Sequence, residues 1–275
     1  MDTQQHSRGR PPRYQHLTGL DDEQLSGLAA VHAVIGPWRQ PVDRPRALGF
    51  VKAIVVTLFY LRRNNTRAVQ AELFGCSRPT IWRYITTLEP VVSVCLDPLE
   101  AAVQVKAERS TLLVDGFLVP TGDLASVNGL RSGKRHTTGA NTQLVTDRYG
   151  RCVDIGEPMH GSMHRVCAFD ESGIAKRHGA HLEPDGPGMI GNCGYIGHVP
   201  ITPIKKSVYR ELTDVDRYFD YLVNRRHAAV ERGIARLRNW KILKTGYHRP
   251  LHRPTGTLHT VVKLEMCHAH PEKTF

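Results

Sequence analysis

Asp115 lies in the middle of the apolar stretch Thr111–Pro120, where a charged side chain needs an explanation. The apolar, largely strand-forming residues of this stretch, which ends at a proline, predict a buried strand. A carboxylate without a partner is costly in an apolar interior, so Asp115 needs a cation, a basic partner or an opening to solvent. We interpret Asp115 as the first carboxylate of a metal-dependent, nuclease-like site.

Glu231 is the second carboxylate of interest, and it lies in a long predicted helical segment, residues 213–243. Apolar residues recur along this segment at helical spacing, namely Val223, Ala229, Val230, Ile234, Leu237 and Trp240. Several arginines surround Glu231 in the sequence. From the residues alone, Asp115 could also be a salt-bridged strand residue, and Glu231 could be one exposed charge on a highly charged helix.

Two short predicted helices, Arg67–Phe74 and Arg78–Leu88, are joined by a turn that contains a glycine, and Ser77 caps the second helix. This pattern is a helix-turn-helix signature, in which the start of the second helix faces DNA bases. The residues expected to contact DNA are Ser77, Arg78, Thr80 and Arg83, with Trp82 or Tyr84 as further candidates. Those assigned to the core are Leu73, Ile81 and Ile85. A helical hairpin that only supports the domain is the alternative.

The composition favours an anionic partner. The net charge is +11 and the isoelectric point is about 9.6, which points first to nucleic acid and only distantly to an acidic membrane surface. Composition bias or solubility is the alternative explanation.

Six scattered cysteines without a Cys-x-x-Cys pair predict neither a zinc ribbon nor a disulfide scaffold. The histidines near the C-terminus match no metal-ligand spacing and are expected at the surface: His248, His252, His259, His268 and His270.

Composition and periodicity divide the chain into three parts. Residues 1–16 are a basic tail that we expect to be disordered, residues 17–108 form a helical domain, and residues 109–275 form an α/β domain. The further helices expected cover residues 20–35, 48–61, 91–105, 169–177 and 258–266. The further strands expected cover residues 141–147 and 151–156, and residues 188–197 are expected to form a strand that leads into a glycine-rich turn. The polar N-terminus and the lack of a long apolar run predict a cytoplasmic protein.

Several motifs follow Val114-Asp115-Gly116 in a defined order. They are Ser132-Gly133-Lys134 with Gly139-x-Asn141-x-Gln143, then Gly161-Ser162, then Gly194-Tyr195-Ile196-Gly197 with Thr202-Pro203-Ile204-Lys205-Lys206, and finally Asn224–Arg232 with Asn239–Leu243. Together with the helix-turn-helix, this set resembles bacterial insertion-sequence transposases of the DDE superfamily. The resemblance spans nearly the whole chain. Each motif is weak by itself, and the specificity comes from their order.

The resemblance implies an RNase H-like mixed sheet with flanking helices, preceded by an all-α helix-turn-helix domain. In the family, two aspartates and a glutamate hold two divalent ions, with Mg²⁺ expected, for cleavage and transfer of DNA strands. Carried over, the first aspartate falls on Asp115, the second on Asn192 and the glutamate on Glu231, so Asp115 and Glu231 are the expected metal ligands. The expected phosphate contacts are Lys134, Lys205 and Lys206, with a solvated basic face as the alternative.

Three positions depart from the family pattern. Asn192 replaces the second aspartate, and Arg165 and His227 stand where the family carries aspartate and arginine. An amide keeps one oxygen ligand but removes a full charge from a site that must concentrate two dications, so we expect impaired cleavage. Asp185 or Glu183 could supply the missing charge from the preceding loop, although their spacing does not support it.

The expected partner is double-stranded DNA at transposon ends, and no membrane partner is expected. A homodimer on the DNA fits such a partner, and so does a nucleoid-associated location in the cytoplasm. Two other functions stay open. One is a catalytically inactive, repressor-like derivative that still binds DNA, and the other is a relic without a selected role.

Overall fold

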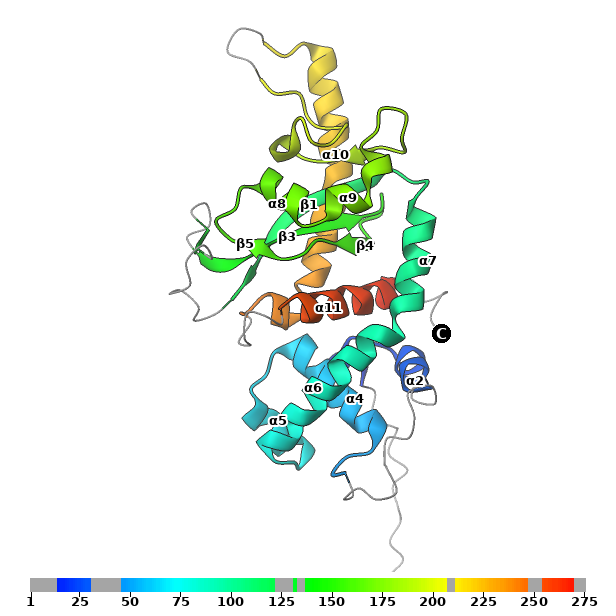
Figure 1. The fold of residues 1–275 in the computed structure, drawn as a ribbon, viewed down its shortest axis with the longest axis vertical. Helices are drawn as coiled ribbons and strands as arrows, with labels where there is room; N and C mark the ends of the chain where they lie inside the picture. Colours follow the sequence, from blue (N-terminus) through cyan, green and yellow to red (C-terminus); the bar gives the residue numbers. More distant parts are fainter. Residues whose placement is uncertain are drawn as a thin grey trace, which may run out of the picture.

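A computed structural model describes residues 14–30, 46–121, 131–132, 137–206, 211–246 and 254–269 of the chain (Figure 1). The N-terminal helices lie at one end of an elongated molecule, and the sheet with its own helices lies towards the other end. Most of the predicted basic tail falls outside the described residues, as do Lys134, His248, His252 and His270. None of the described helices is long and apolar enough to cross a membrane.

The helices of the N-terminal part are α1 Gln15–Thr18, α2 Asp22–Ala30, α4 Phe50–Arg63, α5 Arg67–Phe74, α6 Arg78–Cys95 and α7 Asp97–Ala107. Helix α4 is central, because its residues from Ala53 to Leu61 are all buried. Side-chain caps begin α5 and α6, since the hydroxyl of Thr66 accepts from the Val69 N–H and that of Ser77 from the Thr80 N–H. The predicted helix-turn-helix is confirmed, with Gly75 in the left-handed conformation that ends α5.

Two predictions about this part are wrong. Helix α6 does not stop at Pro90 but continues to Cys95, so the helix expected over residues 91–105 is the end of α6 followed by α7. Leu88 and Val92 are buried on either side of Pro90, and this packing outweighs the one helical hydrogen bond that a proline removes. Leu73, assigned to the core, is 58% exposed, whereas Ile81 and Ile85 are fully buried as predicted.

The sheet is mixed, as the sequence predicted. Strand β1 Leu112–Pro120 pairs antiparallel with β3 Thr137–Thr146 and parallel with β6 Met189–Ile190. The shorter strands, all paired with β3, are β2 Arg131–Ser132, β4 Cys152–Ile155 and β5 Met159–His160. Within residues 188–197, the expected strand is β6 and the expected turn after it is the 3-10 turn that begins at Cys193.

Helices cover both faces of the sheet (Figure 1). The remaining helical elements are α8 Arg165–Glu171, α9 Ile174–Arg177, η2 Gly179–His181, η3 Cys193–Tyr195, α10 Asp214–Leu237, η4 Lys241–Leu243 and α11 Pro254–Ala269. Helices α8 and α9 lie on one face, and α10 crosses the other face behind β1 and β3. Trp240, expected on the long helix, lies beyond its end and is fully buried.

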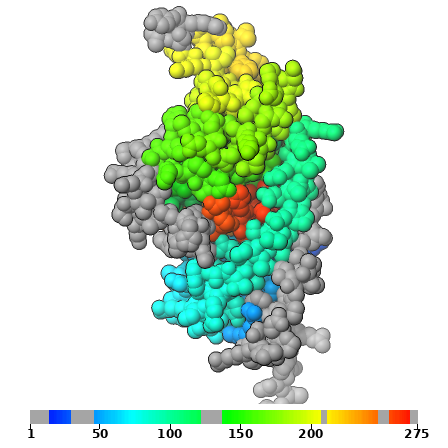
Figure 2. Space-filling model, viewed as in Figure 1, coloured from blue at the N-terminus to red at the C-terminus, as the bar shows by residue number. Residues whose placement is uncertain are grey.

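Helix α11 joins the two parts of the molecule. It packs against α6 and α7 as well as β4, and Figure 2 shows it enclosed between the helical part and the sheet part. The side-chain amide of Gln24 donates to the Cys267 carbonyl at 3.0 Å, and the Trp240 indole donates to Glu265 at 3.0 Å. A single hydrophobic core therefore runs through both parts, and it holds the sheet in a fixed position relative to the helix-turn-helix.

Candidate functional site

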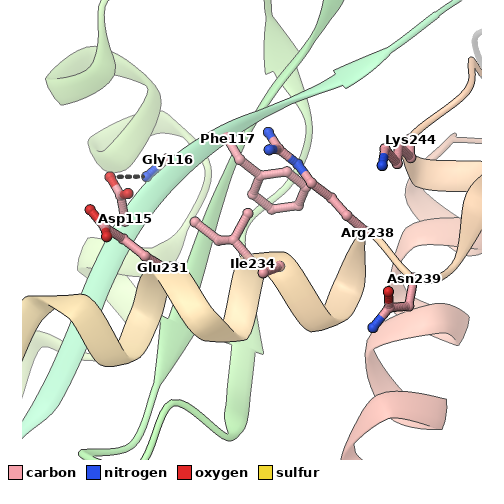
Figure 3. Close-up of a pocket in the computed structure, with 9 residues that line it drawn as sticks. Asp115, Gly116, Phe117, Glu231, Ile234, Arg238, Asn239 and Lys244 are labelled. Atoms are coloured by element: carbon pink, nitrogen blue, oxygen red, sulfur yellow. Dashed lines mark hydrogen bonds between the residues drawn. The ribbon is translucent and has the colours of Figure 1, made fainter.

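The two predicted carboxylates meet in one pocket. Asp115 comes from the middle of β1 and Glu231 from α10, and they line a cavity of about 330 Å³ together with Phe117, Ile234 and Lys244. Figure 3 shows the carboxylate of Glu231 beside that of Asp115 at one end of this pocket. The packing of α10 against β1 brings the two residues together.

Asp115 is nearly buried, and one of its oxygens accepts three hydrogen bonds. The donors to Oδ1 are the backbone N–H of Gly116 at 2.8 Å, Nη1 of Arg165 at 2.7 Å and the side-chain amide of Asn192 at 3.1 Å. Hydrogen bonds that involve a charged group are stronger than neutral ones. The sequence left a cation, a basic partner or an opening to solvent as ways to stabilise this carboxylate. The structure provides the basic partner, Arg165.

The amide of Asn192 has a defined orientation. Its oxygen accepts a hydrogen bond from the backbone N–H of Gly194 at 2.9 Å, which can only donate. The Nδ2 group must therefore face Asp115, where it donates at 3.1 Å. Asn192 thus contributes a donor at this position, whereas an aspartate would contribute a second negative charge.

Arg165 is held in place by its surroundings. It is the first residue of α8, and its guanidinium carbon lies 5.7 Å from the centre of the Tyr195 ring. Tyr195 is fully buried, and its hydroxyl donates a hydrogen bond to the side-chain oxygen of Gln143 on β3. Burial, together with the nearby charge of Asp115, raises the pKa of the Tyr195 hydroxyl, so Tyr195 stays neutral.

His227, the third departure from the family pattern, precedes the pocket residue Glu231 by one turn of α10. Its Nε2 is 3.3 Å from the carbonyl oxygen of Val114, and its Nδ1 is 3.9 Å from a carboxylate oxygen of Glu231 one turn later on α10. His227 is buried, whereas the side chain of Glu231 is 66% exposed. His227 therefore ties α10 to β1 directly beside Asp115.

The donor set does not fit two divalent ions. Such ions require carboxylate oxygens that are free to coordinate them. Here Asp115 is bound to the guanidinium of Arg165, and Asn192 presents N–H groups instead of oxygen. Among the described residues, no group of three or more His, Cys, Asp and Glu side chains could hold a metal ion. Glu183 and Asp185 are exposed and do not line the pocket, so neither supplies the missing charge.

The far side of the pocket carries polar residues that the sequence analysis did not single out as site residues. Arg238, Asn239 and Lys244 lie at the end of α10 and just beyond it, and Figure 3 shows them across the pocket from the two carboxylates. Two of them are cationic, so the pocket combines an acidic end with a basic end. Asn239 belongs to a motif that was part of the resemblance, but its position on this pocket depends on the turn after α10.

Three of the residues predicted to contact DNA, Ser77, Thr80 and Arg83, form a connected group at the start of α6. The hydroxyls of Ser77 and Thr80 lie 2.9 Å apart, and Nη2 of Arg83 donates to the Thr80 hydroxyl at 3.3 Å. Arg78 and Arg83 are both exposed. Tyr84 is buried and its hydroxyl accepts from the Leu48 N–H, so this candidate does not face DNA.

Trp82 has a neighbour that the sequence analysis missed. The guanidinium carbon of Arg67, at the first position of α5, lies 5.0 Å from the centre of the Trp82 ring. Lys205 and Lys206 are exposed, but they lie near the start of α10, at the opposite end of the molecule from α5 (Figure 1). The structure therefore does not bring the predicted basic contacts into one surface.

Comparison with known proteins agrees with this geometry. Residues 114–264 match the family described as DDE superfamily endonuclease, and residues 46–98 match the family described as helix-turn-helix of DDE superfamily endonuclease. No curated protein and no solved structure matches the chain. The first match covers more than half of the sequence, and it includes Asp115, Asn192 and Glu231. The chain therefore belongs to the DDE superfamily of endonucleases, in which it combines a transposase-type endonuclease domain with a helix-turn-helix.

Proposed function

We propose that this protein binds transposon-end DNA as DDE transposases do and that its metal-dependent cleavage is impaired. Members of the superfamily depend on divalent metal ions for cleavage and transfer of DNA strands. In that chemistry Asp115, Asn192 and Glu231 occupy the positions of the catalytic carboxylates, and Asp115 and Glu231 would be the metal ligands, with Mg²⁺ the expected ion. Recognition of the duplex would rest on the start of α6.

The observation that carries this proposal is the contact between Arg165 and Asp115. A guanidinium 2.7 Å from Oδ1 neutralises the carboxylate on which the family's first ion depends. A dication in this position would have to displace Arg165 and would also meet the N–H groups of Asn192. Compared with the aspartates of the family pattern, Arg165 and Asn192 both lower the negative charge of the site. Both therefore weaken metal binding for the same electrostatic reason.

The experiment restores the family's carboxylates. Arg165→Asp and Asn192→Asp are made singly and together, and the full chain is incubated with Mg²⁺ or Mn²⁺ and a supercoiled plasmid that carries the DNA flanking the gene. We expect the double variant to nick the plasmid at least on the order of 100-fold faster than the wild type, because each 1.4 kcal/mol of transition-state stabilisation is worth about tenfold. Adding Asp115→Asn to the double variant should abolish nicking.

A second readout separates metal binding from cleavage. The melting temperature of the wild type should not respond to Mg²⁺ or Mn²⁺, whereas that of the double variant should rise with the metal and fall with a chelator. A wild type that nicks DNA as fast as the double variant, in a reaction that Asp115→Asn removes, contradicts the proposal.

The same experiment tests the alternative of an inactive, repressor-like derivative, which the Arg165–Asp115 contact also favours. That function predicts a wild type that binds the flanking duplex without any nicking and a double variant that remains inactive. Assembly as a homodimer on DNA, and a nucleoid-associated cytoplasmic location, belong to the proposal in either form. A protein that binds neither flanking nor random duplexes would leave the relic interpretation.

A further inference from the structure

The N-terminal half of α10, residues 214–226, carries a cluster of exposed apolar side chains; we call this segment the α10 tip. Figure 1 shows the tip extending beyond the sheet, and in the space-filling view it forms one end of the molecule (Figure 2). Its exposed apolar side chains are Val215 (77% exposed), Tyr218 (63%), Phe219 (39%), Tyr221 (56%) and Leu222 (39%). Single exposed apolar residues are common, but a contiguous group of them marks an interaction surface.

The tip is a well-formed helix from its first residue. The hydroxyl of Thr213 accepts from the Asp216 N–H at 3.1 Å, and the Asp216 carboxylate accepts from the Thr213 N–H at 2.9 Å. These two hydrogen bonds are a capping box, which stabilises a helix start. Asp220 also accepts a hydrogen bond from the backbone of Ile204 at 2.7 Å, which holds the tip against the preceding segment.

Val215, Tyr218 and Leu222 lie on a face of α10 that does not face the core, whereas Phe219 is four residues before the buried Val223 and lies on the core side. The buried stripe of this helix contains Val223, Val230, Ile234 and Leu237. A second stripe, which we call the tip stripe, consists of Val215, Tyr218, Leu222 and Arg225 at spacings of three, four and three residues. Such spacing places all four side chains on one side of the helix, as in helices that pair with another helix.

We propose that a second copy of this chain covers the tip stripe, through antiparallel pairing of two α10 tips around a two-fold axis. The stripe is self-complementary about the level of residue 220. In an antiparallel pair, Tyr218 of one copy faces Leu222 of the other, and Val215 faces the aliphatic part of Arg225. A single patch can therefore serve both copies, which is the condition for a closed, two-fold symmetric dimer.

The charges of the tip favour the antiparallel arrangement. Asp214, at the start of the helix, is 97% exposed and pairs with Arg217 of the same helix at 3.1 Å, and Arg225 is exposed three turns later. Antiparallel pairing brings Arg225 of each copy next to Asp214 of the other, whereas parallel pairing would place like charges together. The arrangement thus combines apolar contacts in the middle with an opposite-charge pair at each end.

The same charges argue against DNA as the occupant of the stripe. Over the whole tip, residues 214–226, the three aspartates Asp214, Asp216 and Asp220 are balanced by three arginines, Arg217, Arg225 and Arg226. The tip therefore lacks the excess of positive charge with which the chain as a whole would attract phosphate groups. This pairing deepens the homodimer that the proposed function includes, but it requires neither DNA nor a metal ion, so its test can fail separately from the test of cleavage.

Sedimentation velocity of the full chain without DNA tests this inference. A contact limited to one helix tip is small, so the concentration series should extend from about 5 to about 200 µM. We expect a monomer–dimer equilibrium in the wild type and at least a tenfold weaker association in the variant Tyr218→Glu/Leu222→Glu. Tyr149→Glu is the matched control, because Tyr149 is similarly exposed (56%) but lies in a distant turn; it should leave the equilibrium unchanged.

A charge exchange tests the antiparallel register. Asp214→Arg alone and Arg225→Asp alone should each weaken association, because each places like charges together, and the double variant should restore it. Circular dichroism of every variant checks that α10 is still folded. A wild type that is monomeric at all concentrations would overturn the inference, and so would a double variant as weak as the single ones. Loss of DNA affinity in Tyr218→Glu/Leu222→Glu, with a monomeric wild type, would assign the stripe to DNA instead.

Discussion

The guanidinium of Arg165 lies 2.7 Å from Oδ1 of Asp115, at the point where β1 and the start of α8 meet beside the pocket. The two residues are 50 positions apart in the sequence, and both side chains are largely shielded from solvent. One carboxylate, which the family uses to attract metal ions, is thus satisfied by a cation that belongs to the protein itself. This relationship explains how the strand tolerates a buried charge, and it leads to the first prediction.

Removal of Arg165 should destabilise the protein. Arg165→Ala leaves Asp115 without its charged partner, and hydrogen bonds to charged groups contribute about 1.5–3 kcal/mol. We expect the free energy of unfolding, measured by urea denaturation, to fall by this amount. The matched control is Arg83→Ala, which removes an exposed arginine from α6 and should change the stability by less than about 0.5 kcal/mol. Equal stability of Arg165→Ala and the wild type would mean that the contact does not hold Asp115.

The start of α6 should determine sequence preference. Arg78→Ala and Arg83→Ala are each expected to reduce the difference in affinity between the preferred and a random duplex by about 1–3 kcal/mol, with a smaller loss of affinity for random DNA. Competition binding at several salt concentrations measures both quantities. Lys176→Ala, an exposed lysine on α9, is the control and should preserve the preference. Affinity that does not fall with salt would contradict DNA binding through phosphate contacts.

Asp154 should make stability depend on pH in acid. It is buried on β4, and although burial opposes ionisation, hydrogen bonds from His178 at 2.9 Å and Arg177 at 2.8 Å lower the pKa of this carboxyl below its usual value. A carboxyl whose pKa is lower in the folded state stabilises the fold at pH values above its unfolded pKa, about 3.9, and loses this contribution as the pH falls further.

The variant Asp154→Asn isolates this effect from other carboxyl groups. The difference in stability between the wild type and Asp154→Asn should be constant from about pH 7 to about pH 5 and should shrink as the pH falls below about 4. Urea denaturation at each pH measures it. Two stability curves that run parallel through the acid range would show that Asp154 is not responsible.

Gly150 should tolerate no side chain. Its φ is 78°, and a Cβ atom at this position would lie 2.1 Å from the backbone oxygen of Ala229 on α10. Because neither the turn nor the helix can move without disturbing the sheet, Gly150→Ala should lower the free energy of unfolding by more than about 2 kcal/mol. Gly179→Ala is the control, since a Cβ there meets nothing within 4 Å and φ is not in the left-handed region. Similar stabilities for the two variants would contradict the close contact between the turn and α10.

The sequence by itself determined the elements that carry local signals. Ser77 and Gly75 mark the helix-turn-helix because a cap and a left-handed turn depend on neighbouring residues only. The strand around Asp115 and the helix around Glu231 were predictable for the same reason, since their apolar periodicity is local. The order of motifs then indicated the family. Local signals failed at Pro90 and Leu73, where packing against other elements decides the outcome.

Only the tertiary structure decided what the site contains. The sequence predicted that Arg165 and Asn192 depart from the family, but not that both donate hydrogen bonds to the same oxygen of Asp115. The sequence also predicted that the α10 tip belongs to a long helix, but it did not show which face of that helix is exposed. Contacts between residues 50 or more positions apart depend on how β1, α8, η3 and α10 pack, and no local pattern encodes the direction in which a side chain meets a distant element.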